Sequence, residues 1–174
     1  MPNRAGTGRV QLPRKERTVF KTVVWASDGS KDAQAALEVA KTMANVSGGR
    51  LIAVYVRQLV VSRGGGVSIQ YNDAEVQADL RRTVDELRED GLDASLTVVR
   101  TTRSNPARSI ANAALEAQAD LIVLGSRDHS PTVSLLLGSV GQRLVKLAPC
   151  PVMSVPNPAI ARETNQEAKR SLAA

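Results

Sequence analysis

Five short apolar runs, separated by longer stretches of helical spacing, constrain the fold of this chain more than any other feature. The runs are dominated by Val, Leu, Ile and Ala, which is typical of parallel strands buried on both faces. Right-handed crossovers over such a series give a single doubly wound, Rossmann-like α/β sheet, with helices on both faces and strand order 3-2-1-4-5. The five expected strands are Thr22–Ala26, Leu51–Val56, Leu96–Arg100, Leu121–Leu124 and Val152–Val155.

Four helices are expected between these strands, and most of their ends are marked by a cap residue or a break. The third helix should place Ile110, Ala111, Ala114 and Leu115 toward the sheet, because these residues recur at helical spacing. The expected boundaries are Ser30 and Gly48-Gly49 for the first helix, Gly91 for the end of the second, Ser104 or Asn105 for the start of the third, and Leu136 or Gly138 to Leu147 for the fourth.

The basic charge of the chain is concentrated near its N-terminus. The net charge is +6, and residues 1–22 hold six basic side chains against one acid. We therefore expect residues 1–20 to form a basic flexible tail, residues 21–156 one domain, and residues 157–174 a C-terminal tail. The basic tail predicts at most weak, non-specific contact with nucleic acid or other polyanions.

Composition narrows the remaining function classes. Aromatic residues make up only 2% of the chain, which weakens a role in stacking single-stranded bases. One cysteine, Cys150, and one histidine, His129, exclude an intrachain disulfide and argue against a zinc site. No apolar run has the length of a membrane span or of a signal peptide, so we expect a cytoplasmic protein without a membrane partner. The glycine-rich stretch VSRGGGVSIQYN is expected to be a flexible crossover, with a lid over a ligand as the alternative.

Two unusual segments follow the ends of expected strands. Asp28-Gly29-Ser30 follows the first strand, and a second segment begins at Gly125 after the fourth. In a sheet of this order the first and fourth strands are neighbours at the point where the winding reverses, and ligands bind beyond the carboxyl ends of the strands there. The topology therefore predicts a binding site between these two segments.

The second segment has the composition of an anion-binding loop. Gly125 ends a strand, and Gly138 with Ser139 lies near a helix start, where free amides and a hydroxyl favour a phosphate. The alternative is that both glycines only form turns. A Ser-His-Asp triad is rejected, because His129 has no identifiable orienting partner.

Three stretches give the chain a family resemblance. They are VVWASDGSKDAQAALEVAKTMA, ADLIVLGSR and LLLGSVGQRLVKLAPCPVMSV, and together with the spacing between them they cover roughly Thr22 to Pro156. The chain resembles the universal stress protein family, and the closing block is the most specific part of the match. The fold that the resemblance implies is the doubly wound sheet expected above.

The nucleotide-binding branch of that family has a motif of Gly, two residues, Gly, nine residues, and then Gly followed by Ser or Thr. Gly125 matches the first glycine, and Gly138 with Ser139 matches the last pair at the same spacing. Asp128 stands where the family has its middle glycine. The resemblance thus implies a nucleotide site with one altered position in the loop around the phosphates.

The same resemblance implies roles for four more residues, and Arg127 is a further candidate from its charge alone. Asp28 matches the acid that contacts the adenosine moiety, although it can also be read as a turn former, and Val56 matches the strand position whose backbone meets the base. Ser126 and Val140 align with neighbours of the phosphates. Arg127 has two readings, as a partner of a phosphate or as a solvated loop residue.

The function implied is that of a stress-response binding or regulatory protein. It would bind ATP or a related adenine nucleotide weakly, with Mg²⁺, at the carboxyl ends of the first and fourth strands, and form a homodimer through the last strand. The alternative is a dimeric regulator that acts through its surface without a nucleotide. Slow ATP hydrolysis is a third reading that the fold permits, but no catalytic base is evident, so a non-enzyme is expected.

Overall fold

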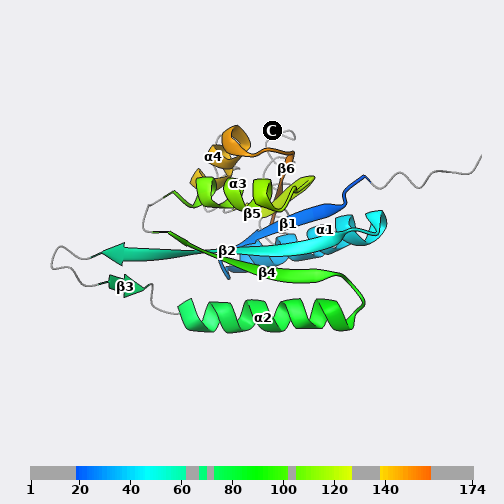
Figure 1. The fold of residues 1–174 in the computed structure, drawn as a ribbon, viewed down its shortest axis with the longest axis horizontal. Helices are drawn as coiled ribbons and strands as arrows, with labels where there is room; N and C mark the ends of the chain where they lie inside the picture. Colours follow the sequence, from blue (N-terminus) through cyan, green and yellow to red (C-terminus); the bar gives the residue numbers. More distant parts are fainter. Residues whose placement is uncertain (1–18, 62–66, 70–72, 102–104, 127–137, 158–174) are drawn as a thin grey trace, which may run out of the picture.

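The computed structural model describes residues 19–61, 67–69, 73–101, 105–126 and 138–157. Strands and helices alternate along this part of the chain (Figure 1). In chain order the elements are β1 (Thr22–Ser27), α1 (Lys31–Ser47), β2 (Arg50–Val61), β3 (Val67–Ile69), α2 (Asp73–Glu89), β4 (Ala94–Thr101), α3 (Pro106–Glu116), β5 (Leu121–Ser126), α4 (Ser139–Leu147) and β6 (Val152–Pro156).

The predicted parallel sheet is confirmed. β1 lies between β2 and β5, while β4 pairs with β2 and β6 pairs with β5, all in parallel. Counted along the chain, these five strands have the order 3-2-1-4-5. The carboxyl ends of β1 and β5 are therefore side by side at the reversal of winding, as the site hypothesis requires.

The segment after β2 contains a strand that the sequence analysis did not predict. β3 pairs antiparallel with Leu59–Val61 at the end of β2, so the expected flexible crossover carries a short hairpin. This hairpin extends beyond the body of the parallel sheet (Figure 1). Residues 62–66, with the three successive glycines, lie outside the described residues.

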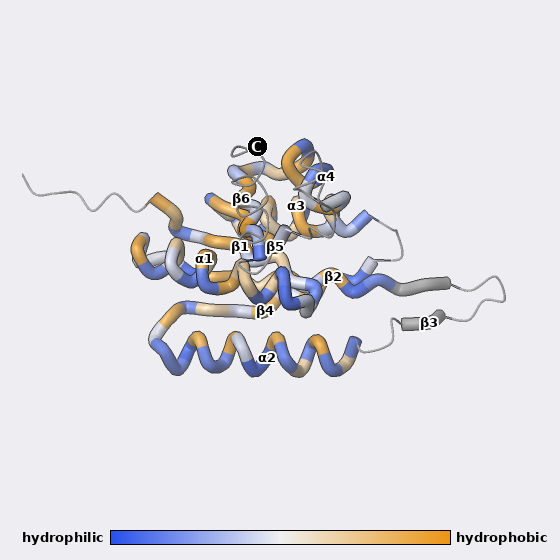
Figure 2. Tube along the Cα trace, turned by 180° about the vertical axis from the view of Figure 1, so that it is seen from behind, coloured by the Kyte–Doolittle hydropathy of each residue, from blue (hydrophilic) through white to orange (hydrophobic). Residues whose placement is uncertain are grey.

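Two helices cover each face of the sheet. On one face α1 and α2 pack over a core that includes Trp25, which is fully buried, and Leu80. On the other face α3 and α4 pack over a core with smaller side chains, among them Ala107 and Ala114. In Figure 2 the strands are mostly in apolar colours, whereas α2 alternates between blue and orange along its length. This alternation is typical of an amphipathic helix, which packs its apolar face on the sheet and exposes its polar face to solvent.

The helix ends follow the sequence signals closely. The Ser30 side chain accepts a hydrogen bond from the Ala33 amide and caps α1, and of the two candidates for α3 the structure shows Asn105 accepting from the Arg108 amide. Ser104 lies outside the described residues. Leu115 was expected to face the sheet, and this was wrong: it is 63% exposed, because α3 turns Ala113, Ala114 and Ala117 toward the core here and leaves Leu115 outside. None of the helices in the described ranges is long and apolar enough to cross a membrane.

Candidate functional site

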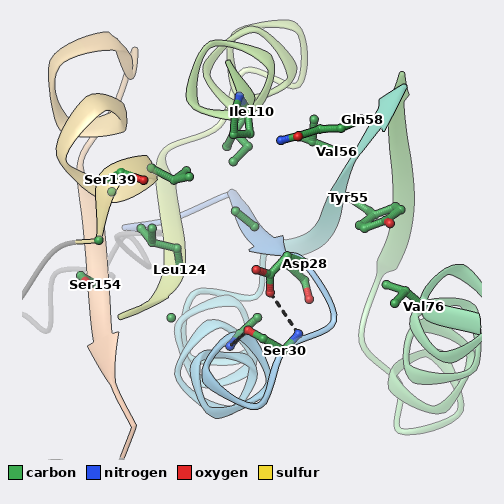
Figure 3. Close-up of a pocket in the computed structure, with 18 of the residues that line it drawn as sticks. Asp28, Ser30, Tyr55, Val56, Gln58, Val76, Ile110, Leu124, Ser139 and Ser154 are labelled. Carbon is green, nitrogen blue, oxygen red and sulfur yellow. Dashed lines mark hydrogen bonds between the residues drawn. The ribbon is translucent and has the colours of Figure 1, made fainter. Parts of the chain in front are cut away.

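A cavity of about 380 Å³ lies at the carboxyl ends of β1, β2 and β5 (Figure 3). The first turns of α1, α2, α3 and α4 also contribute to its walls, so elements distant in sequence converge on it. Its lining residues are Ala26, Ser27, Asp28, Ser30, Ala33, Tyr55, Val56, Gln58, Asp73, Val76, Pro106, Ile110, Leu124, Gly125, Gly138, Ser139, Val140, Gly141 and Ser154.

Most of the residues that the sequence analysis singled out meet in this cavity. Six line it, and a seventh, Ser126, is buried at the end of β5 without lining it. Arg127 and Asp128 lie outside the described residues. The six lining residues are Asp28, Val56, Gly125, Gly138, Ser139 and Val140.

Asp28 is placed by a tight turn between β1 and α1. Its Oδ1 accepts a hydrogen bond from the Ser30 amide at 3.0 Å, and Gly29 adopts a φ of +79° that favours glycine. Asp28 is therefore a turn former, as one reading proposed. It also lines the cavity, near the middle of the close-up (Figure 3).

Gly125 is needed for the packing of α1 on β5. A Cβ atom built at this position would lie 2.1 Å from the backbone oxygen of Asp32 and 2.7 Å from the amide nitrogen of Ala33. Only glycine lets the first turn of α1 come this close to the strand. The sequence analysis considered Gly125 as part of a phosphate-binding loop or as a turn former. The structure shows a third role, in the packing of α1 on β5.

The wall formed by α4 and β6 holds polar groups that lack hydrogen-bond partners among the described residues. Gly138 is the N-cap of α4 and supplies no side-chain cap bond, so the first amides of this helix lack that partner at the cavity. The Ser154 hydroxyl on β6 is buried, lines the cavity and has no hydrogen-bond partner among the residues that the structure describes. Figure 3 shows Ser139 and Ser154 on the same side of the cavity. Helix amides and hydroxyls in this arrangement suit an anion.

The wall formed by β2 and α2 is held by a buried carboxylate that the sequence analysis missed. Asp73 is 5% exposed, and its Oδ1 accepts a hydrogen bond from the Tyr55 hydroxyl at 2.9 Å. Its Oδ2 accepts from Gln77 Nε2 at 2.7 Å and forms an ion pair with Arg57 Nε at 2.8 Å. We call these four residues the Asp73 cluster. Burial, and then the hydrogen bond to Asp73, raise the pKa of Tyr55 to about 12.

The comparisons with known proteins agree with the fold. The model of the universal stress protein family matches residues 20–156. The curated protein "Universal stress protein in QAH/OAS sulfhydrylase 3'region" of Thermus aquaticus is 36% identical over 144 residues, which cover 79% of this chain and 99% of that protein.

Two solved structures add spatial agreement. A universal stress protein from Archaeoglobus fulgidus is 26% identical, with a TM-score of 0.61 and coverage of 78% of this chain and 97% of that one. A universal stress protein in complex with cAMP is also 26% identical, with a TM-score of 0.56 and coverage of 78% and 96%. Because the family model spans nearly the whole described part and a curated relative matches almost end to end, this chain belongs to the universal stress protein family.

Proposed function

We propose that this protein binds an adenine nucleotide in the cavity, with ATP and Mg²⁺ as the physiological form, and that it acts by binding rather than by catalysis. The observation that carries the proposal is the cavity itself. It opens at the reversal of the sheet winding, where α/β sheets bind ligands, and its volume of about 380 Å³ is within the range of small-molecule sites. The related structure in complex with cAMP supports the same ligand class.

The chemistry of the walls suggests how the ligand is oriented. Phosphates would lie against the first amides of α4 and the hydroxyls of Ser139 and Ser154, where the helix dipole favours negative charge. Asp28, in the middle of the cavity, would accept hydrogen bonds from ribose hydroxyls. The base would then lie toward Val56 and Ile110, on the apolar side of the cavity.

The loop residue Asp128 is the basis for proposing weak binding. A carboxylate about 4 Å from a phosphate oxygen costs roughly 4 kcal/mol at an effective dielectric of 20, before a metal ion or a nearby cation reduces it. We expect Asp128→Gly to tighten ATP binding by about tenfold or more, with the larger gain in the absence of Mg²⁺. Equal affinities of the two proteins would show that Asp128 does not face the phosphates.

Calorimetric titration with ATP tests the proposal directly. Asp28→Asn should weaken binding by about tenfold, because it removes a charge-assisted hydrogen bond. Asp93→Asn is a matched control, since Asp93 is exposed and does not line the cavity. Wild-type protein that binds no adenine nucleotide at millimolar concentration, and releases none on denaturation, would overturn the proposal.

A homodimer through β6 is the second part of the proposal. In the described sheet β6 pairs only with β5, so its other edge is unpaired, and its apolar side chains Val152, Met153 and Val155 are half-buried. Such an edge favours pairing with a second copy. Sedimentation that finds only monomer at micromolar concentration would contradict it. A dimer that binds no nucleotide would favour the alternative, a regulator that acts through its surface.

A further inference from the structure

Gln58 occupies a distinctive position at the end of the parallel part of β2. The pairing of β2 with β1 ends at Tyr55, whereas its pairing with β4 continues to Gln58. Val56 to Gln58 therefore extend past the end of β1, beside the cavity. Figure 3 shows the Gln58 side chain directed across the cavity toward Ile110, close to Val56.

The surroundings of the Gln58 amide are apolar. Val56 shares its face of the strand, because side chains two residues apart point the same way, and Ile110 and Pro106 face it from the start of α3. Gln58 is half-buried, and the described residues provide no hydrogen bond to its amide. A terminal amide has both donors and an acceptor, so this group beside the apolar lining residues Val56 and Ile110 is suited to the edge of a nitrogen heterocycle.

We propose that Gln58 is a specificity-determining residue that recognises the adenine ring through its exocyclic amine and the neighbouring ring nitrogen. Its oxygen would accept from the amine while its NH₂ group donates to the ring nitrogen, the pairing that glutamine forms with adenine in nucleic acids. This inference rests on the proposed function. Figure 3 supports it, because Ser139 at the start of α4 and Gln58 lie on different walls of the cavity, with Asp28 below both.

The test compares ATP with purine riboside triphosphate, which lacks the exocyclic amine. Wild-type protein should bind ATP about tenfold more tightly than the analogue, the effect of roughly 1.4 kcal/mol of hydrogen bonding. Gln58→Met keeps the length of the side chain and removes the amide, so ATP should lose both hydrogen bonds and bind more than tenfold more weakly. The analogue keeps the ring nitrogen and should lose only one bond, so its affinity should fall about tenfold less than that of ATP and the preference should disappear.

Two further proteins keep the test decisive. Gln34→Ala is the control, because Gln34 is exposed on α1 outside the cavity, and it should retain the preference for ATP. Gln58→Ala provides a second variant in case the Met side chain disturbs the cavity. Thermal unfolding of both variants tests whether they are folded. ATP binding that is weakened by Asp28→Asn but unchanged in both Gln58 variants would overturn this inference alone. Absence of any nucleotide binding by the wild-type protein would overturn the proposed function together with it.

Discussion

The two ends of the cavity are built in different ways. At the β2 end, the buried carboxylate of the Asp73 cluster has three partners from β2 and α2, all within the protein. At the α4 end, the described residues provide no side-chain cap for the helix N-terminus and no hydrogen-bond partner for the Ser154 hydroxyl. At the β2 end the polar groups bond to one another and hold the wall in place. At the α4 end the polar groups remain available to bond a ligand. Mutations should therefore affect stability at the first end and ligand binding at the second.

The largest effect is expected for Gly125→Ala, on β5 between the two ends. The new Cβ would meet the backbone of α1 at 2.1 Å, which side-chain movement cannot relieve, so we expect a loss of about 3 kcal/mol in the free energy of unfolding. Gly48→Ala is the control: Gly48 has a positive φ, unlike Gly125, and nothing within 4 Å of an added Cβ, so backbone strain alone should cost about 1 kcal/mol. Urea unfolding measures both. Equal losses would show that α1 shifts away from β5 at little cost.

The next effect tests the rigid end of the cavity. Asp73→Ala leaves the Tyr55 hydroxyl and the Arg57 guanidinium without their buried partner, and should cost about 2 to 3 kcal/mol of stability, a value reduced because Arg57 is partly exposed. Asp79→Ala also removes an acid of α2 that pairs with an arginine, Arg82, but both are exposed. It should change the free energy of unfolding by less than about 0.5 kcal/mol. A similar small change in both variants would mean that the Asp73 cluster does not stabilise this wall.

The pKa of Tyr55 gives a pH-dependent test of the same end. Because folding raises this pKa from about 10 to about 12, the protonated phenol stabilises the folded state. That contribution is complete below pH 10 and is lost as the pH rises through 12, by roughly 2 kcal/mol. Tyr71→Phe leaves Tyr55 as the only tyrosine, so its ultraviolet absorbance can be titrated alone. An ordinary pKa near 10 would show that the hydroxyl is not held by Asp73.

The smallest effect on stability is expected at the α4 end. Ser154→Ala removes a buried hydroxyl that bonds to none of the described residues, so the free energy of unfolding should change by less than about 0.5 kcal/mol or rise slightly. If the hydroxyl contacts phosphates, the same variant should weaken ATP binding about threefold to tenfold and leave adenosine binding unchanged. If Ser154→Ala lowered the stability and left the ATP affinity unchanged, the α4 end would contribute to stability and not to ligand binding.

The sequence predicted the features that depend on local signals. Helix caps such as Ser30 and Asn105, and the five parallel strands, were found because capping and hydrophobic spacing act over a few residues. The order of the strands placed Asp28 and Ser139 in one site, since topology determines which strand ends meet.

The remaining features depend on contacts between distant residues. Asp73 has the sequence appearance of an ordinary acid at a helix start, and only the approach of α2 to β2 makes it a partner of Tyr55. Ser154 is a single polar residue in an apolar strand, so neither spacing nor composition distinguishes it. Gly125 matched a motif, but its packing against α1 follows from the approach of two backbones that no local pattern encodes.

A bond between the two ends of the domain affects the order in which the chain can fold during synthesis. The buried carboxylate of Asp32, in the first turn of α1, accepts a hydrogen bond from Asn157, 125 residues later. A ribosome makes α1 long before it makes Asn157, or Gly125 on which the same turn rests. The nascent first helix must therefore keep this carboxylate in water, and the complete domain forms only after β6 has left the exit tunnel.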